Sequence, residues 1–254
     1  QIMYDTPEKK LAKGQLKQAE YDHIMSDKDE TVAADGSALK KISWFKLLTF
    51  RQTWAFFLGK LLTDPVWWFF LFWLPAFLKE EYGLTGTQVS FPIALVYTMT
   101  TFGSIFGGWL PKYFIEHGLD ANKARKKAMF IYALFPLTVL SAQYMGGFSM
   151  WYAVIIIGIA ASAHQAWSAN IFTTVSDMFP KRAIASVTGI GGMAGAVGGI
   201  LIAKSAGLLF DHYKALGDIK IGYGIMFMIC AIAYLIAWFV MHALVPKFKK
   251  IDLE

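Results

Sequence analysis

Six long apolar runs, separated by short polar clusters, dominate the hydropathy pattern of the chain. Crossing about 30 Å of hydrocarbon takes roughly 20 mostly apolar residues in a helix. Only helices and closed barrels satisfy the backbone polar groups in that medium. The pattern therefore predicts an all-α membrane protein with six transmembrane helices, which cover approximately Thr53 to Phe77, Val89 to Leu110, Ala128 to Met145, Met150 to Val175, Ile184 to Phe210 and Ile221 to Val245.

The composition supports a lipid bilayer as the main partner of the chain. Hydrophobic residues make up 56% of the sequence and charged residues only 17%, which is more apolar than a soluble domain usually is. The net charge of +6 does not indicate nucleic-acid binding, because the basic residues stand at the ends of the apolar runs. The single cysteine, Cys230, excludes a disulfide framework or a Cys-based metal site, and no cofactor is predicted.

Basic residues near the span ends predict the orientation in the membrane. Fourteen Lys and Arg flank one side of the six spans and three flank the other. Because an excess of basic residues marks the cytoplasmic side, both ends of this chain are predicted to be cytoplasmic.

Residues 1–42 are polar and nearly neutral, with seven Lys against eight Asp and Glu, so they cannot span a membrane. Thr6-Pro7-Glu8 predicts a helix start, and a flexible segment is expected over Asp27 to Ser37. We interpret residues 1–42 as a cytoplasmic linker, 43–250 as the six-helix bundle and 251–254 as a cytoplasmic tail. The first residue is Gln1 and no signal peptide is visible, so we expect the sequence to be a fragment.

Three stretches resemble the anion:cation symporter branch of the major facilitator superfamily. GKLLTDPVWWFFLFWLPAFL (59–78) is similar to the seventh helix of its sugar-acid carriers, and residues 107–127 resemble the degenerate loop motif between helices eight and nine. Residues 164–200 resemble helices ten and eleven. The resemblance implies the C-terminal half of a twelve-helix major facilitator fold.

Within that branch, Asp64-Pro65 followed by Trp67-Trp68 looks most like the hexuronate transporters. This resemblance implies proton-coupled uptake of a sugar-acid anion through a bacterial inner membrane, by alternating access of two six-helix halves around a midplane site. The missing N-terminal half would be the partner of this chain. In the family, the residues that couple protons lie chiefly in that half.

Lys60 is the leading candidate for substrate binding. It lies about seven residues into the first span, where a charge is costly unless it faces a cavity or a partner. Asp64 is one turn further on the same face and can pair with it. We expect Lys60 to bind the substrate carboxylate while Asp64 holds the ammonium or accepts sugar hydroxyls. The alternatives are a purely structural ion pair and a Lys60 that snorkels to the cytoplasmic surface.

Polar and aromatic side chains elsewhere in the spans complete the candidate site. Trp67 and Trp68 continue the stripe of Lys60 and Asp64, and either ring can cover the apolar face of a sugar, although such rings also pack on lipid or on neighbouring helices. The fourth span carries a polar patch that is predicted to line a wet cavity, and for its histidine bonding between helices is an alternative. The patch comprises His164, Gln165, Trp167, Ser168 and Asn170.

The fifth span is rich in glycine, which favours close helix packing. Thr188 can still reach the site. Several members of the family carry an Asn near Gly192 and this chain does not, so the resemblance implies no substrate contact at that position. Lys204 is expected to snorkel.

Charged residues at the cytoplasmic span ends are candidates for an inner gate closed by ion pairs. The alternative is an ordinary cluster of orienting positive charges. The gate candidates are Lys112, Arg125, Lys126, Asp177 and Arg182.

Two other classes of protein compete with a transporter. An intramembrane enzyme needs a nucleophile with a base, or a metal pair, and the spans offer neither. A channel needs a repeated pore loop, and no such segment is visible. Among transporters, the sequence leaves open an aldonate, an aldarate or another small organic anion as the substrate, and Na⁺ as the coupling ion.

Overall fold

A computed structural model describes residues 5–25 and 42–251 of the chain. Six of the described helical segments are long and apolar enough to cross a membrane, as predicted. They are α4 (Arg51–Tyr82), η2 with α5 (Gly86–Glu116), α6 to α7 (Ala121–Gly146), α8 (Met150–Met178), α9 (Lys181–Ala215) and α10 (Ile219–Leu244). The chain is therefore an all-α, multi-pass membrane protein.

Most helices extend beyond the predicted runs, because hydropathy marks only the apolar part of a helix. The third span differs in another way. It is α6 (Ala121–Leu134), then the 3₁₀ segment η3 (Phe135–Ser141), then α7 (Ala142–Gly146). Pro136 lies at the start of η3 and cannot donate the backbone hydrogen bond that a continuous α-helix requires there.

Two short helices precede the bundle. Thr6 caps α1 (Pro7–Ala12) through its hydroxyl, which accepts a hydrogen bond from the Lys9 amide at 3.5 Å, so the predicted helix start is confirmed. Helix α2 (Gln18–Met25) packs on α1. The predicted flexible segment, Asp27 to Ser37, lies outside the described residues. Helix α3 (Trp44–Leu48) leads into α4.

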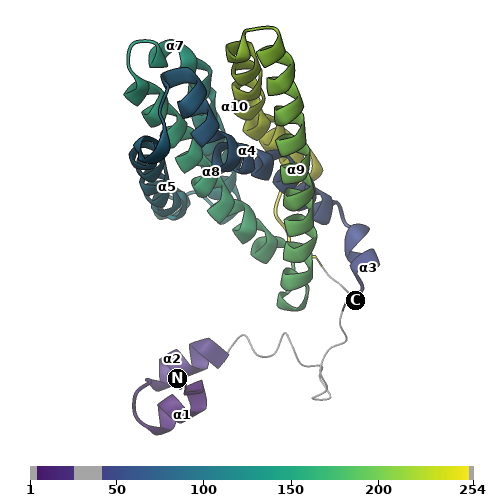
Figure 1. Cartoon of the computed structure of the whole chain (residues 1–254). Helices are drawn as coiled ribbons and strands as arrows, with labels where there is room; N and C mark the ends of the chain where they lie inside the picture. The colour runs from purple at the N-terminus through teal and green to yellow at the C-terminus, as the bar shows by residue number, and fades with distance from the viewer. Residues whose placement is uncertain (1–4, 26–41, 252–254) are drawn as a thin grey trace.

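Helix pairs that are distant in sequence build the bundle. In Figure 1, α5 lies beside α8, and α9 runs beside α4. Glycine makes both contacts close: a Cβ on Gly103 or Gly107 of α5 would overlap the backbone of Ser162 or Ala166 in α8. The predicted use of the α9 glycines is confirmed, since Gly198 packs on Pro65 of α4.

The bundle has ordered helix ends. Asp120 accepts a hydrogen bond from the Lys123 amide at 3.0 Å and so caps α6. This bond lowers the pKa of the Asp120 carboxyl, because it stabilises the ionised form.

Candidate functional site

Lys60 and Asp64 form an ion pair inside α4. The Lys60 Nζ lies 2.7 Å from the Asp64 Oδ2, and the two side chains are 7% and 17% exposed. The predicted pair therefore forms. Arg51 begins the helix, and Asp64 lies further from that end than Lys60 does. The ammonium is thus directed away from the nearer helix end, which is the opposite of snorkelling.

Two neighbouring helices enclose this ion pair. The Lys60 ammonium lies 4.4 Å from the centroid of the Phe172 ring, which belongs to α8. Gly195 of α9 packs directly against the Asp64 carboxylate. Phe172 was not among the sequence candidates, because an isolated Phe in an apolar run carries no signal of a cation contact.

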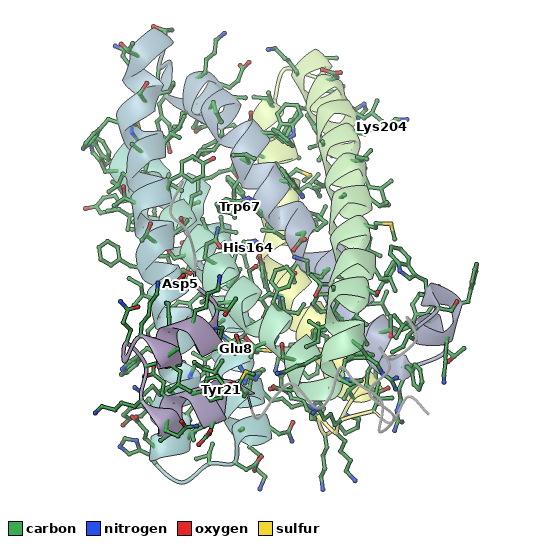
Figure 2. The ribbon with its side chains drawn as sticks, turned by 90° about the horizontal axis from the view of Figure 1, so that it is seen from below. Asp5, Glu8, Tyr21, Trp67, His164 and Lys204 are labelled. Carbon is green, nitrogen blue, oxygen red and sulfur yellow. The ribbon has the colours of Figure 1, made fainter. Side chains whose placement is uncertain are left out.

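His164 of α8 connects Trp67 of α4 to α10. Its ring stacks on Trp67, with centroids 5.2 Å apart and planes 14° apart, and Figure 2 shows the two side by side within the bundle. Its Nδ1 lies 2.6 Å from the Tyr234 hydroxyl. That hydroxyl also donates to the Thr63 carbonyl at 3.4 Å. We call Lys60, Asp64, Trp67, His164 and Tyr234 the midspan cluster.

Tyr234 is the member of this cluster that sequence reasoning missed. It is fully buried in α10, the most apolar of the spans. A tyrosine hydroxyl buried in such a helix needs a hydrogen-bond partner, and that requirement is the signal by which it can be found.

Trp68 continues the predicted stripe of Lys60 and Asp64, but it faces α9, whereas Trp67 faces His164. Its ring packs on Gly199 of α9 and stacks on Phe72, with centroids 5.6 Å apart. One residue step along a helix turns a side chain by about 100°, so Trp67 and Trp68 meet different neighbours.

The polar patch on α8 does not line one shared cavity, contrary to the prediction. Trp167 is completely buried against the Tyr234 ring, and its Nε1 has no hydrogen-bond partner among the described residues. Asn170 faces α5 instead, where its amide donates to the Gly107 carbonyl at 2.7 Å. The absence of a side chain at Gly107 leaves that carbonyl accessible, and a buried amide group requires such an acceptor.

Gln165 and Thr188 remain uncommitted side chains. Both are half-buried, on α8 and α9 respectively. Within residues 5–25 and 42–251, neither side chain has a recorded hydrogen-bond partner.

The proposed gate residues separate into different contacts. Arg125 of α6 pairs with Asp177 of α8, its Nε 2.7 Å from Oδ2. Lys112 instead pairs with Glu116, at 3.7 Å on the same helix. Lys126 donates to the carbonyls of Val245 and Pro246, where α10 ends and leaves its carbonyls without partners inside the helix.

Arg182 is half-buried and has no ion-pair partner among the residues that the structure describes. One ion pair among the gate candidates, Arg125–Asp177, is therefore present, and the inner gate itself stays a prediction. Arg125 lines a cleft of about 420 Å³ between α5, α6 and α8, which Lys112 and Asn170 also line.

The midspan cluster combines a cation with hydrogen-bonding and aromatic groups inside a membrane bundle. Such a combination suits an organic anion, since the ammonium attracts a carboxylate and a flat ring covers an apolar face. No group of three or more His, Cys, Asp or Glu that could hold a metal ion occurs in the described part of the chain. The fold and the cluster together are typical of a membrane transport protein.

Comparison with known proteins identifies the family. The family model described as Major Facilitator Superfamily matches residues 3–203, so the chain belongs to this superfamily. Its members are transporters and not enzymes, which removes the intramembrane enzyme as a rival.

Three similar proteins, all from Escherichia coli, are named after sugar acids. The chain is 28% identical to the hexuronate transporter of strain K12 over 77% of this chain and 43% of the relative. It is 25% identical to the D-galactonate transporter of O6:H1, over 83% and 49% of the two chains. It is 24% identical to the probable galactarate/D-glucarate transporter GarP of K12, over 82% and 46%. The chain spans about half the length of these relatives.

Proposed function

We propose that the chain forms the second half of a twelve-helix carrier that imports hexuronates together with protons by alternating access. The observation that carries the proposal is the Lys60–Asp64 ion pair, which lies mostly buried in a membrane-spanning helix that also carries Trp67, the ring stacked on His164. A buried charge pair is weak support for stability but strong support for a functional site in a membrane.

Four members of the midspan cluster act on the substrate in this proposal. Lys60 binds the substrate carboxylate, and Asp64 holds the ammonium in position until the substrate arrives. Trp67 covers the apolar face of the pyranose, and His164 offers a ring nitrogen to a hydroxyl. Gln165 and Thr188 are available for further hydroxyls, because their side chains are not engaged by described residues. Trp167 and Asn170 do not touch the substrate: Trp167 packs on the Tyr234 ring, and Asn170 holds α8 against the Gly107 carbonyl of α5.

The surroundings of the carrier follow from the same proposal. We place the chain in the inner membrane of a bacterium, with both ends in the cytoplasm, and we expect the partner half to face the site from the other side. The Arg125–Asp177 pair would then stiffen the cytoplasmic end of α6 and α8 in one state of the transport cycle.

An aldonate or aldarate is the alternative substrate. It is supported by the likeness to the galactonate and galactarate/D-glucarate transporters, which cover more of this chain than the hexuronate transporter does. The cluster recognises a carboxylate in all of these substrates, so geometry alone does not rank them.

Uptake of labelled glucuronate into cells that make the intact carrier tests the proposal. Lys60→Ala should abolish uptake at an unchanged amount of protein in the membrane. Lys204→Ala is the matched control, because Lys204 is an exposed lysine on the outer side of α9 (Figure 2) and its loss removes the same charge. The double variant Lys60→Ala/Asp64→Ala leaves no unpaired buried carboxylate and separates loss of binding from loss of folding.

Competition by unlabelled galactonate and glucarate ranks the substrate classes. Stronger competition by either acid than by galacturonate would favour the alternative substrate. Full uptake by Lys60→Ala would end the proposed role of the ion pair.

A further inference from the structure

Asp64 depends on Lys60 alone for its charge balance. Among the described residues, the Asp64 carboxylate has one hydrogen-bond and ion-pair partner, the Lys60 ammonium. On the α9 side the carboxylate meets Gly195, which has no side chain that could donate a hydrogen bond. An Asp64 that loses Lys60 is left as a buried carboxylate without a donor.

The other helices around the cluster supply no second cation. Within the described part of the chain, the titratable groups around the cluster are His164 from α8, Tyr97 from α5 in edge contact with Trp67, and two groups from α10, Tyr234 and Cys230 one turn before it. Helix α9 contributes none at the Asp64 carboxylate. With His164 neutral, the cluster carries one positive and one negative charge, and its net charge is zero.

A sugar-acid anion disturbs this balance when it binds. Its carboxylate competes with Asp64 for the single Lys60 ammonium. The site would then hold two carboxylates and one ammonium, and in a poorly hydrated region an uncompensated charge is strongly disfavoured. Adding one proton to the carboxylate that loses Lys60 restores neutrality.

We infer that Asp64 is a proton-coupling residue: it takes up one proton when the substrate carboxylate replaces it on Lys60, and it releases that proton when the substrate leaves. In the binding step, the Lys60 ammonium changes its partner from Asp64 to the substrate, and the Asp64 carboxylate becomes a carboxylic acid with a proton from water. No electrons move. The inference rests on the proposed function, and it places a coupling proton in this half of the carrier.

His164 is the alternative proton acceptor, and the charge balance at Lys60 argues against it. Its Nδ1 is engaged by the Tyr234 hydroxyl at 2.6 Å and its ring is stacked under Trp67. Protonation of His164 would also leave the Lys60–Asp64 pair intact, so the substrate would still have to compete with Asp64. Only protonation of Asp64 frees Lys60 and balances the charge in one step.

Calorimetry on the purified wild-type carrier tests the inference without any substitution. Binding of glucuronate is measured in two buffers with different ionisation enthalpies, which gives the number of protons taken up. We expect one proton to be taken up per anion bound. Because binding consumes a proton, the affinity should weaken by about tenfold for each unit by which the pH is raised, in the range where Asp64 of the free carrier is ionised. Binding without proton uptake would overturn the inference.

Two variants assign the proton to a residue. Asp64→Asn should bind glucuronate with an affinity independent of pH, exchange labelled for unlabelled substrate across proteoliposomes, and fail to accumulate it in response to a proton gradient. His164→Gln should bind glucuronate more weakly, because it loses a proposed substrate contact, but each anion that binds should still bring one proton. Proton uptake that is lost in His164→Gln and retained in Asp64→Asn would assign the proton to His164 and overturn the inference.

If Asp64→Asn does not fold, the wild-type calorimetry and the variant Asp64→Glu still test the inference. Asp64→Glu retains a titratable group and should therefore retain proton uptake. Failure of the proposed function looks different, because the wild-type carrier would then not bind or exchange any of the sugar acids.

Discussion

Gly195 of α9 packs so closely on Asp64 of α4 that a Cβ at position 195 would overlap the carboxylate oxygen Oδ2. The carboxylate that pairs with Lys60 is therefore positioned from two sides, by the ammonium one turn earlier and by the backbone of a helix more than 100 residues later in the chain. The geometry of the candidate site depends on this helix contact.

Gly195→Ala should displace Asp64 or separate α9 from α4. Overpacking of this kind costs about 1–3 kcal/mol. We expect a lower melting temperature in detergent and a strongly reduced rate of sugar-acid uptake. Gly192→Ala is the control, because a Cβ at Gly192 meets nothing within 4 Å and should leave both quantities unchanged. Equal melting temperatures and equal uptake rates for the two variants would show that the close contact between Gly195 and Asp64 is not needed for stability or transport.

Tyr234→Phe removes the hydroxyl that bonds to His164 but keeps the ring that packs on Trp167. A hydrogen bond between membrane helices contributes about 1 kcal/mol, so we expect a modest loss of stability in chemical unfolding. Uptake should fall further than stability, since His164 loses its fixed orientation. Tyr223→Phe is the comparison, because Tyr223 is buried with no recorded hydroxyl bond among the described residues.

Gly103→Ala should weaken the packing of α5 on α8. The added Cβ would meet the backbone of Ser162, which cannot move aside as a flexible side chain can. We expect a loss of about 1–3 kcal/mol in unfolding free energy. Gly108→Ala, on the same helix but with nothing within 4 Å, should be neutral or slightly stabilising. A neutral Gly103→Ala would mean that the two helices can separate at little cost.

Arg125 and Asp177 should be energetically coupled. Their side chains are only 15% and 30% exposed, and the pair links two helices. A double-mutant cycle with alanine at both positions should give a coupling energy of about 1 kcal/mol, at the upper end for exposed pairs. The Lys112–Glu116 pair, exposed and separated by 3.7 Å, should give close to zero in the same measurement. A similar coupling energy in both cycles would contradict the distinction drawn between them.

Local pattern was sufficient for the six spans and for one central contact. The six spans follow from runs of apolar residues, since lipid allows almost no other solution for the backbone. The Lys60–Asp64 pair follows from a spacing of four on one helix. Thr6 likewise predicts the start of α1, because a helix-capping side chain bonds to a backbone amide within three residues of it.

The neighbours of each side chain across the bundle were decided only by tertiary structure. Trp67 and Trp68 are adjacent in sequence, yet one stacks on His164 and the other packs on Gly199. Asn170 and His164 belong to one polar patch, yet they bond to α5 and α10. Tyr234 reaches the site from the last span. Hydropathy and spacing report on single helices, whereas these contacts depend on how each helix is rotated about its axis, which the packing of all six sets together.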